Sequence, residues 1–311
     1  MATMKAIRIH QFGDSSVLRL EFIEIPHPQV GEVLVRIAAA SVNPVDYKIR
    51  QGEFPPVSEE KLPITLGRDF SGVVEQVGSG VGSFAKGDRV FGMVGGDASY
   101  AEYAVIKIEH LAKIPENLDF IHAAAVPLAA QTAWQALFDH GHLEAGQRVL
   151  IQGASGGVGH FAVQLAAAKG AMVYATGSDK SARFISALGA DRVIDYTRER
   201  FEDVCSDIDL VVNLVSGEMQ QRSWAVLRPG GILVSTLSEP ARNRPDAYGK
   251  NSRFFLVEPS GAQLADIAQL IKGELVSVKV NVTFPLKSAA AAQDYLEKSH
   301  IEGKVVLTVD G

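Results

Sequence analysis

The chain has 311 residues, of which 47% are hydrophobic and 21% charged, and its formal net charge is −6. This is the composition of an ordinary globular protein, and the acidic balance gives no support to a nucleic-acid partner or to binding at an anionic membrane surface. The single cysteine, Cys205, excludes a disulfide within the chain and a cysteine-rich zinc lobe. The length favours about two domains.

Neither the first residues nor the most apolar segment indicates a membrane protein. The N-terminal residues lack the long apolar stretch of a secretion signal. The most apolar long segment, 121–138, is mostly alanine and contains histidine, proline and glutamine, which does not fit a membrane span. We therefore expect a cytoplasmic protein with no membrane association.

The first 120 residues are predicted to form short strands. Apolar and polar residues alternate, and glycine-rich turns such as 78–87 separate the runs. The expected strands cover residues 5–9, 32–37, 70–77, 88–91 and 101–106. Many short strands joined by glycine turns indicate a barrel-like β domain.

The pattern changes near residue 120. Asp119 is expected to cap a helix over 121–128, which Pro127 should break or bend, and a second helix is expected over 132–140. From Arg148 onward the expected strands are 149–151, 172–175, 193–194, 210–214 and 232–237, and the expected helices are 159–169, 181–188, 219–227 and 263–272. This alternation predicts a parallel sheet covered by helices.

The last part of the chain returns to mixed character. Residues 276–284 are expected to be extended, 287–298 to form an alanine-rich helix and 304–309 to form a strand, and this tail is expected to rejoin the first domain. The polar segment 238–252 is the best candidate for a mobile loop over a site.

A glycine-rich turn follows the expected strand 149–151. Glycines stand at positions 153, 156, 157 and 159, and an apolar helical pattern begins at once. A strand, a glycine turn and a helix start together can hold a dinucleotide, because the backbone can approach the pyrophosphate and the helix N-terminus offers N–H donors. Gly156 and Gly159 fit the second and third positions of the Gly-x-Gly-x-x-Gly pattern, but the first is Ala154. A glycine turn without a ligand is the alternative.

Taken together, the motifs resemble the medium-chain dehydrogenase/reductase superfamily, in its zinc-free quinone oxidoreductase-like branch. The likeness covers nearly the whole chain and is carried by residues 42–47, 67–72, 87–90, 127–137, 153–159, 162–165, 188–191 and 303–306. It implies an α/β protein with a GroES-like β-barrel domain and a Rossmann domain with a doubly wound parallel sheet. The barrel would cover 1–122 and be completed by 276–311, and the Rossmann domain would cover 123–275. In this branch Ala154 is the usual first residue of the glycine motif.

The resemblance also implies hydride transfer without a metal. Zinc-dependent relatives have a cysteine where this chain has Asn43 and a Gly-His-Glu block where it has Gly67-Arg68-Asp69, so we expect no metal ligands. By family position, Asn43 and Tyr47 would donate hydrogen bonds to the acceptor. Asn43 as a turn residue before a proline and Tyr47 as a packing residue are the alternatives. We expect Asp46 to cap a helix or orient a neighbour, and Arg68 and Asp69 to form an internal pair.

Cofactor choice follows from the end of the second Rossmann strand. NAD enzymes usually carry an acidic residue there, whereas this chain has Ser178 at the strand end, with Asp179 after it, followed by Lys180 and Arg183. A hydroxyl with nearby cations fits the 2′-phosphate of NADP(H). Tyr196 matches a family tyrosine beside that phosphate. An ordinary solvated helix face is the alternative for Lys180 and Arg183.

Further cofactor contacts are implied by family position or by strand ends. Val215 and Leu237 end the fourth and fifth strands, where a doubly wound sheet binds its ligand. Together with Ser178, Lys180, Arg183, Tyr196, Val215 and Leu237, the expected cofactor contacts are Pro127, Thr132, Ala154, Ser155, Gly156, Gly157, Val158, Gly159, Phe255, Val257 and Lys304.

The resulting hypothesis is an NADPH-dependent reductase of quinones or α,β-unsaturated carbonyls that works as a homodimer. The alternative is an NADPH-binding sensor or structural protein of the same fold with little catalysis. The sequence does not name the acceptor or the proton donor.

Overall fold

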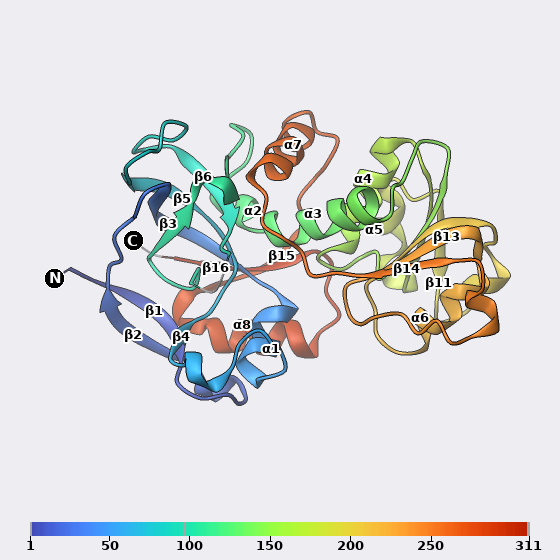
Figure 1. Ribbon diagram of the computed structural model, residues 1–311, viewed down its shortest axis with the longest axis horizontal. Coiled ribbons are helices and arrows are strands. Elements are labelled where there is room, and N and C mark those ends of the chain that lie inside the picture. Colours follow the sequence, from blue (N-terminus) through green and yellow to red (C-terminus); the bar gives the residue numbers. More distant parts are fainter. Residues whose placement is uncertain (1, 96–97, 310–311) are drawn as a thin grey trace. The chain divides into compact units, whose positions relative to one another are not determined.

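A computed structural model describes residues 2–95 and 98–309 of the chain (Figure 1). The chain divides into two compact units. The first contains the residues up to Leu128, Glu258–Gly273 and the tail from Val278, and the second contains Ala129–Val257 and Glu274–Ser277. None of the helices in the described ranges combines the length and apolar character that crossing a bilayer requires.

The first unit is built on two sheets. In the larger sheet the strands follow the order β15-β16-β3-β5-β6-β8, and β7 also pairs with β3. The smaller, antiparallel sheet has the order β2-β1-β4. The strands are β1 (Thr3–Ile9), β2 (Arg19–Glu24), β3 (Glu32–Val42), β4 (Ile64–Thr65), β5 (Asp69–Val77), β6 (Arg89–Met93), β7 (Tyr103–Lys107), β8 (Leu111–Lys113), β15 (Val280–Pro285) and β16 (Lys304–Thr308). The last part of the chain belongs to this unit, where β16 pairs with β3.

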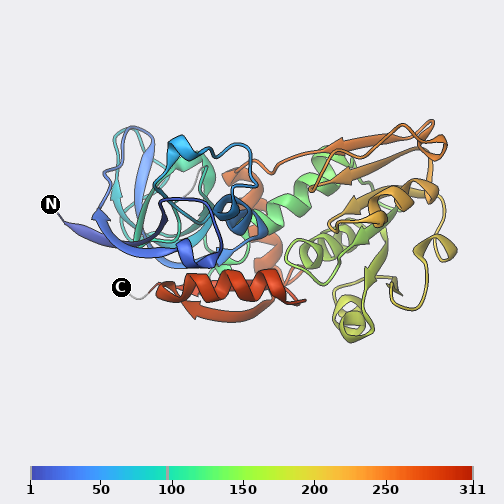
Figure 2. The same cartoon turned by 90° about the horizontal axis from the view of Figure 1, so that it is seen from below.

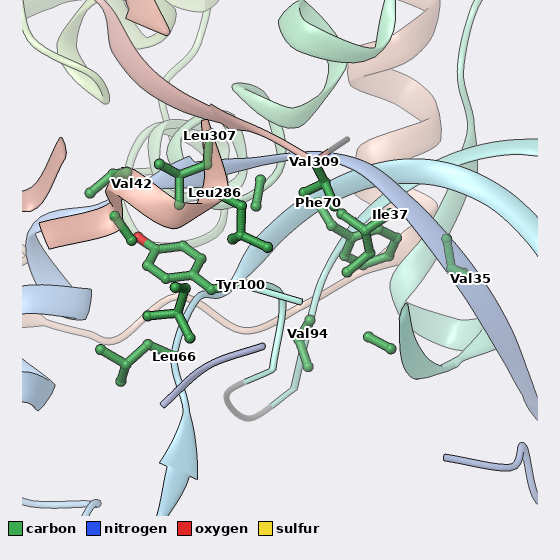
Figure 3. Packing of buried hydrophobic residues seen from close by; sticks show 14 of the residues in the cluster. Val35, Ile37, Val42, Leu66, Phe70, Val94, Tyr100, Leu286, Leu307 and Val309 are labelled. Atoms are coloured by element: carbon green, nitrogen blue, oxygen red, sulfur yellow. The ribbon is translucent and has the colours of Figure 1, made fainter. Parts of the chain in front are cut away.

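Aliphatic residues of these strands form the core of the first unit. Figure 3 shows Tyr100 packed among them, with its hydroxyl oxygen at the edge of the group. Residues of β3, β5 and β16 contribute Val35, Ile37, Phe70 and Leu307 to this core. The polar groups described below lie at the ends of the same strands, and therefore at the border of a well-packed region.

Four α-helices belong to the first unit, namely α1 (Pro44–Gln51), α2 (Phe120–Ala124), α7 (Gly261–Lys272) and α8 (Ala289–Lys298). Helix α8 runs alongside β15 in Figure 2 and contacts both β15 and β16. The capping role predicted for Asp119 is confirmed, since its carboxylate accepts a hydrogen bond from the backbone N–H of His122 at 2.8 Å. The helix expected over 121–128 ends at Ala124, and Pro127 starts a new helix, where its missing N–H costs nothing.

The second unit is a doubly wound parallel sheet. Its strands are β9 (Arg148–Gln152), β10 (Met172–Gly177), β11 (Arg192–Asp195), β12 (Ile208–Asn213), β13 (Leu227–Ser235) and β14 (Asn251–Phe254). All neighbouring pairs are parallel and their order is β11-β10-β9-β12-β13-β14. This is the order 3-2-1-4-5-6 of dinucleotide-binding sheets, in which the strand order reverses between the first and fourth strands. The predicted fold class is thus confirmed for this unit.

Short helices connect these strands. They are α4 (Gly159–Lys169), α5 (Ala182–Ala187) and α6 (Glu218–Arg222), preceded in the chain by α3 (Pro127–Trp134) and a π-helical segment (Gln135–His140). Helix α4 is buried over most of its length, in agreement with its apolar sequence.

The expected domain ranges differ from the units of the structure at three places. The boundary lies after Leu128 rather than after residue 122, and the segment Glu258–Gly273 groups with the first unit rather than with the second. Residues 276 and 277, expected in the first domain, group with the second unit. The reason for the second difference is the packing of α7 on β8: a Cβ at Gly261 would lie only 2.4 Å from the carbonyl oxygen of Leu111. The periodicity of α7 predicts a helix but does not indicate which sheet it covers.

Candidate functional site

Asn43 stands at the junction between strand β3 and helix α1 in the first unit. Its backbone is extended, with φ −124° and ψ 153°, and Pro44 occupies the first position of the helix. The carboxylate of Asp46 accepts a hydrogen bond from the backbone N–H of Asn43 at 2.7 Å. The predicted capping role of Asp46 is therefore confirmed, and the Asn43 side chain is free to make contacts away from the helix.

Three neighbouring strands bring a buried ion pair to the Asn43 side chain. Asp69 is the first residue of β5 and Lys304 the first residue of β16, and both strands pair with β3. The Lys304 ammonium lies 3.7 Å from Asp69 Oδ2 and donates a hydrogen bond to Asn43 Oδ1. Asn43 Nδ2 donates to the same Asp69 oxygen at 3.0 Å. Asn43, Asp69 and Lys304 are at most 3% exposed, so the pair is shielded from water.

Two further donors complete the surroundings of the Asp69 carboxylate. The Ser41 hydroxyl donates to Oδ2 at 2.6 Å and the backbone N–H of Leu128 donates to Oδ1 at 2.7 Å. Burial raises the pKa of Asp69, whereas Lys304 and these hydrogen bonds oppose the rise. Burial likewise lowers the pKa of Lys304, and the two buried carboxyl groups nearby oppose that change. Each charge of the pair thus depends on its partner and on the hydrogen bonds around it.

A second buried carboxyl group, Asp46, belongs to the same cluster. The Tyr100 hydroxyl donates to Asp46 Oδ2 at 2.9 Å, while Asp46 Oδ1 is buried and has no hydrogen-bond partner within the described residues. Burial raises the pKa of Asp46 from 3.8 to about 7, against the lowering effect of its hydrogen bonds with Asn43 and Tyr100. At neutral pH both the protonated and the ionised form of this carboxyl group are therefore populated.

Tyr47, the second donor predicted for the acceptor, follows Asp46 on helix α1. It is half-buried, and burial raises the pKa of its hydroxyl, with a further rise from the carboxylates of Glu297 and Glu53. The phenol consequently remains protonated at neutral pH and can donate a hydrogen bond.

Asn43 and Arg68, at the two positions expected to match zinc ligands of metal-dependent proteins, make other contacts in this chain. Asn43 contacts the ion pair, and the Arg68 guanidinium lies 5.2 Å from the centre of the Phe54 ring. Asp69, for which we expected a pair with Arg68, has Lys304 as its ion-pair partner in the structure. Within residues 2–95 and 98–309 no three His, Cys, Asp or Glu side chains gather in a way that could hold a metal ion.

In the second unit, the glycine-rich turn joins β9 to α4 and is closed by contacts that only glycine allows. Gly153 has φ +76°, and a Cβ there would lie 2.9 Å from the Val215 side chain. A Cβ at Gly159 would lie 2.1 Å from the carbonyl oxygen of Gly153. At Gly156 the nearest atom to a Cβ would be the Gly153 carbonyl oxygen at 3.4 Å, which is ordinary van der Waals contact, so a side chain meets no clash there. The turn is therefore tight at its two ends and accessible in its middle.

The other residues of this turn are accessible or anchor it to the sheet. Ser155, Gly157 and Val158 are partly exposed. Ala154 is buried, and its N–H bonds to the carbonyl oxygen of Thr176 in β10 at 3.1 Å. The Thr176 hydroxyl accepts a hydrogen bond from the N–H of Gly153 at 3.2 Å. The predicted residues 154–159 thus form one cradle beside the end of β10.

The tip of β10 carries hydroxyl and cationic groups. Ser178 follows the strand directly and is held by hydrogen bonds with Ser181, including one from its own N–H to Ser181 Oγ at 3.2 Å. Tyr196, which is 52% exposed, lies beside this tip because its N–H bonds to the carbonyl oxygen of Gly177 at 3.2 Å. Lys180 and Arg183 are exposed just after the tip and form no ion pair within the part of the chain that the structure describes.

Arg198 is a further cation at this tip that the sequence did not reveal. Its guanidinium lies 3.7 Å from the Asp179 carboxylate and 3.5 Å from that of Asp195. The sequence offers only Arg198 and Arg200 after Tyr196, separated by Glu199, and the pairing of β11 with β10 brings this segment to the tip of β10. The segments after β10 and β11 therefore carry three cations and the Ser178 hydroxyl, together with the carboxylates of Asp179 and Asp195 that pair with Arg198.

A chain of buried amide and hydroxyl side chains links the carboxyl ends of the central strands, and sequence reasoning missed it too. Asn213 Nδ2 donates to Gln152 Oε1 at 2.7 Å and to the Val215 carbonyl oxygen at 2.9 Å. Ser235 Oγ donates to Asn213 Oδ1 at 3.2 Å and accepts from Gln220 Nε2 at 3.1 Å. Each of these strands ends in a polar residue after an apolar run, which is the sequence signal for this row.

The remaining predicted residues are distributed over both units. Val215 follows β12 against Gly153, and Leu237 follows β13, where its N–H bonds to Ser235 Oγ at 3.2 Å. Phe255 is buried with its ring centre 4.4 Å from that of His140, and Val257 is half-buried. Pro127 belongs to the first unit, whereas Thr132, buried in the same helix, belongs to the second.

The structure thus assembles the predicted residues into two groups, one in each unit. The first unit brings Asn43, Asp69 and Lys304 into mutual contact and places Tyr47 on the helix that Asn43 caps. The second unit brings residues 154–159, Ser178, Tyr196 and Val215 together around the ends of β9 and β10. Lys304, which was expected to reach a cofactor or cap a cleft, lies in the buried cluster of the first unit.

Comparison with known proteins gives matches over the whole chain. Residues 29–116 match the alcohol dehydrogenase GroES-like domain family, and residues 188–307 match a family described as zinc-binding dehydrogenase. The chain is 34% identical to the NADPH-dependent alkenal/one oxidoreductase of Arabidopsis thaliana chloroplasts, over 98% of this chain and 79% of that protein. It is 33% identical to the quinone oxidoreductase of Rattus norvegicus, over 98% of this chain and 97% of that one. The solved structure of the quinone oxidoreductase from Coxiella burnetii is similar with a TM-score of 0.93 and 34% identity, over 99% of this chain and all of that one.

Proposed function

The chain belongs to the medium-chain dehydrogenase/reductase superfamily, in its quinone oxidoreductase-like branch, and from this membership we propose that it is a zinc-independent, NADPH-dependent reductase of quinones and α,β-unsaturated carbonyls. The observation that carries the proposal is the glycine cradle of the second unit together with its cationic tip. A tight turn that has no room for a Cβ at Gly159, leaves residues 155–158 partly exposed and is followed after β10 by Ser178 instead of an acidic residue fits the pyrophosphate and the 2′-phosphate of NADPH.

Residues of the second unit would hold the cofactor. The accessible backbone of residues 155–158 would bind the pyrophosphate, and the N-terminus of α4 adds positive dipole there. Ser178, Lys180, Arg183 and Arg198 would bind the 2′-phosphate through charge-assisted hydrogen bonds. We propose that Tyr196, Val215, Leu237, Phe255 and Val257, with Pro127 and Thr132, contact the rest of the dinucleotide.

When bound, NADPH supplies a hydride to the acceptor, and one proton completes the reduction to a hydroquinone or a saturated carbonyl compound. Negative charge develops on the acceptor oxygen as the hydride arrives, because conjugation delocalises the added electron pair onto it. The amide N–H of Asn43 and the hydroxyl of Tyr47 would donate hydrogen bonds to that oxygen. This delocalisation makes a metal unnecessary, and the residues at the zinc-ligand positions, Asn43 and Arg68, carry an amide and a guanidinium, which are not among the side chains that usually bind zinc.

The names of the relatives support the choice of acceptors. Two of them are described as acting on alkenals and enones or on quinones, and a third, from Solanum lycopersicum, is a 2-methylene-furan-3-one reductase that is 33% identical over 98% of this chain. All three acceptor types contain a carbonyl conjugated to a carbon–carbon double bond. We propose that this chain acts on the same chemical class.

An acceptor screen tests the proposal. The purified protein is mixed with NADPH and a panel of quinones, alkenals and exocyclic enones, and oxidation of NADPH is followed by its absorbance, with NADH and a chelator-treated sample in parallel. We expect oxidation with at least one conjugated acceptor, a clear preference for NADPH and no loss on chelation. Binding of NADPH without oxidation by any acceptor would instead support a sensor or structural role.

We further propose that the protein is a cytoplasmic homodimer. The outer side of edge strand β14 has no strand partner within the described part of the chain, so it offers backbone groups for pairing with a second copy. The only cysteine of the sequence, Cys205, is buried and cannot form a disulfide within the chain, which is usual for proteins of a reducing compartment. Size exclusion with light scattering tests the dimer, and a monomer mass would contradict it.

A further inference from the structure

The contacts of Asn43 reveal how its amide is oriented. The oxygen and nitrogen ends of a side-chain amide have nearly the same shape, so only their partners distinguish them. In this structure Oδ1 faces the Lys304 ammonium, which can only donate, and Nδ2 faces the Asp69 carboxylate, which can only accept when ionised. Reversing the amide would set two donors against each other on one side and two acceptors on the other. The ion pair therefore permits a single orientation.

The same contacts leave one N–H of the Asn43 amide only weakly hydrogen-bonded. One hydrogen on Nδ2 is taken by Asp69 at 3.0 Å, and among the residues that the structure describes the other has only the long contacts to the carbonyl and hydroxyl oxygens of Ser41 at 3.4 and 3.5 Å. A hydrogen bond at such a distance is weak, so this N–H can exchange it for a better acceptor. The ammonium at the amide oxygen also withdraws electron density, which makes the remaining N–H a stronger donor.

Stability alone does not account for the ion pair. Burying an ammonium and a carboxylate carries a desolvation penalty that their attraction often fails to exceed, and apolar replacements of such pairs are frequently neutral or stabilising. The strand that begins with Lys304 continues with Val305 and Val306, both fully buried, so an apolar residue would suit the start of this strand. The ion pair is better explained by its effect on the orientation of the neighbouring Asn43 amide.

We propose that Lys304 and Asp69 are positioning residues that fix the Asn43 amide, so that its second N–H is directed to, and polarised for, the oxygen of the conjugated acceptor. The role assigned to the acceptor rests on the proposed function, whereas the orientation of the amide does not. Lys304 thus acts through Asn43 rather than by touching the cofactor.

A double-mutant cycle tests the proposal. Asn43→Ala, Lys304→Met and the double variant are compared in NADPH-dependent reduction of the acceptor found in the screen. We expect Asn43→Ala to lower kcat/KM for the acceptor by roughly a hundredfold, as for loss of an oxyanion donor. Lys304→Met should lower it as well, but should cause little further loss in the Asn43→Ala background, and Lys304→Arg should recover part of the rate. Multiplicative losses in the double variant would overturn the proposal.

Two controls separate positioning from folding. The dissociation constant of NADPH, measured by fluorescence, should be the same in all variants, because the second unit is unchanged. Lys107→Met removes an exposed lysine at the end of β7 and should leave all kinetic constants unchanged. A loss of NADPH affinity in Lys304→Met alongside the loss of rate would indicate general damage and count against positioning.

A structural readout decides the orientation without turnover. The side-chain amide resonances of Asn43 are assigned by their disappearance in Asn43→Ala. In the wild type we expect one of the two amide protons to be shifted strongly downfield by Asp69, and we expect this shift to collapse in Lys304→Met and in Asp69→Asn. Amide protons that lack a downfield shift in the wild type and keep the same chemical shifts in both variants would refute the positioning role, even if the enzyme is active. If no acceptor is reduced but the shift is present, the proposed function fails and the orientation stands.

Discussion

The buried carboxyl group of Asp46 makes the stability of the protein depend on pH in a defined direction. Its pKa is raised from 3.8 to about 7 in the folded state, with burial as the main cause. The folded protein therefore holds a proton that the unfolded chain has released between these values, and stability falls as pH rises through this window. With 1.36 kcal/mol for each pKa unit, roughly 2–3 kcal/mol is lost between pH 5 and pH 8.

Asp46→Asn removes this titration and keeps most of the geometry. The asparagine oxygen can still accept from the Asn43 N–H and the Tyr100 hydroxyl, which both bond to Oδ2 in the wild type. Its NH₂ group would replace the buried oxygen that lacks a partner, which adds a cost of roughly 1–3 kcal/mol that does not vary with pH. The change with pH, rather than the absolute stability, is therefore the quantity to compare.

The assay is urea unfolding of both proteins, followed by circular dichroism at pH 5, 6, 7 and 8. Titrations common to both proteins cancel in the difference, and the variant should gain roughly 2–3 kcal/mol relative to wild type across this range. Tyr100→Phe serves as the opposite control: it removes a hydrogen bond that lowers the pKa of Asp46, so the pH dependence should persist and move to higher pH. Parallel stability curves for wild type and Asp46→Asn would refute the reasoning, because they would mean that Asp46 titrates alike in both states.

Three further predictions concern the second unit. Gly159→Ala places a methyl group 2.1 Å from the Gly153 carbonyl oxygen, so we expect a loss of roughly 1–3 kcal/mol in stability together with weaker NADPH binding, measured by thermal unfolding and by fluorescence titration. Gly156→Asp has room for its side chain but sets a carboxylate beside the pyrophosphate; NADPH affinity should be lost while the melting temperature is kept, and normal affinity would contradict the cradle assignment. Lys180→Ala and Arg183→Ala should each weaken NADPH by roughly tenfold and leave NADH unchanged, as judged by titration with both cofactors, and equal effects on both would exclude contact with the 2′-phosphate.

Elements with strong local signals could be predicted from the sequence. The glycine turn before α4, the apolar strands of the parallel sheet and the cap at Asp119 are encoded within a few residues, and the structure has them. The placement of α7 on β8 could not be predicted, because an amphipathic helix fits many sheets and the choice depends on the close approach at Gly261. Pro127 indicated a break, but whether it ends one helix or begins another depends on packing outside the sequence window.

The candidate site divides in the same way. The cradle at 153–159 and the hydroxyl at Ser178 lie within one βαβ unit, so spacing predicts their proximity. The contact of Lys304 with Asn43 joins residues 261 positions apart, and it exists only because β16 returns to pair with β3. The family block 303–306 indicated a role for Lys304, but nothing in the local sequence indicated that its ammonium would contact Asn43 rather than a cofactor.

Buried charge also distinguishes the proposed acceptor site in the first unit from the proposed phosphate-binding site in the second. A phosphate group brings its own charge, so a cradle of backbone N–H groups and exposed cations suffices, and such a site can sit at the surface. An acceptor carbonyl is neutral and becomes negative only as the hydride arrives, so the groups that stabilise it must be oriented before any charge is present. Asn43 meets that requirement when the orientation of its amide is fixed before the acceptor binds. An ammonium and a carboxylate can fix it only where water does not compete for their hydrogen bonds. The burial of Lys304 and Asp69 is thus what the proposed positioning role demands.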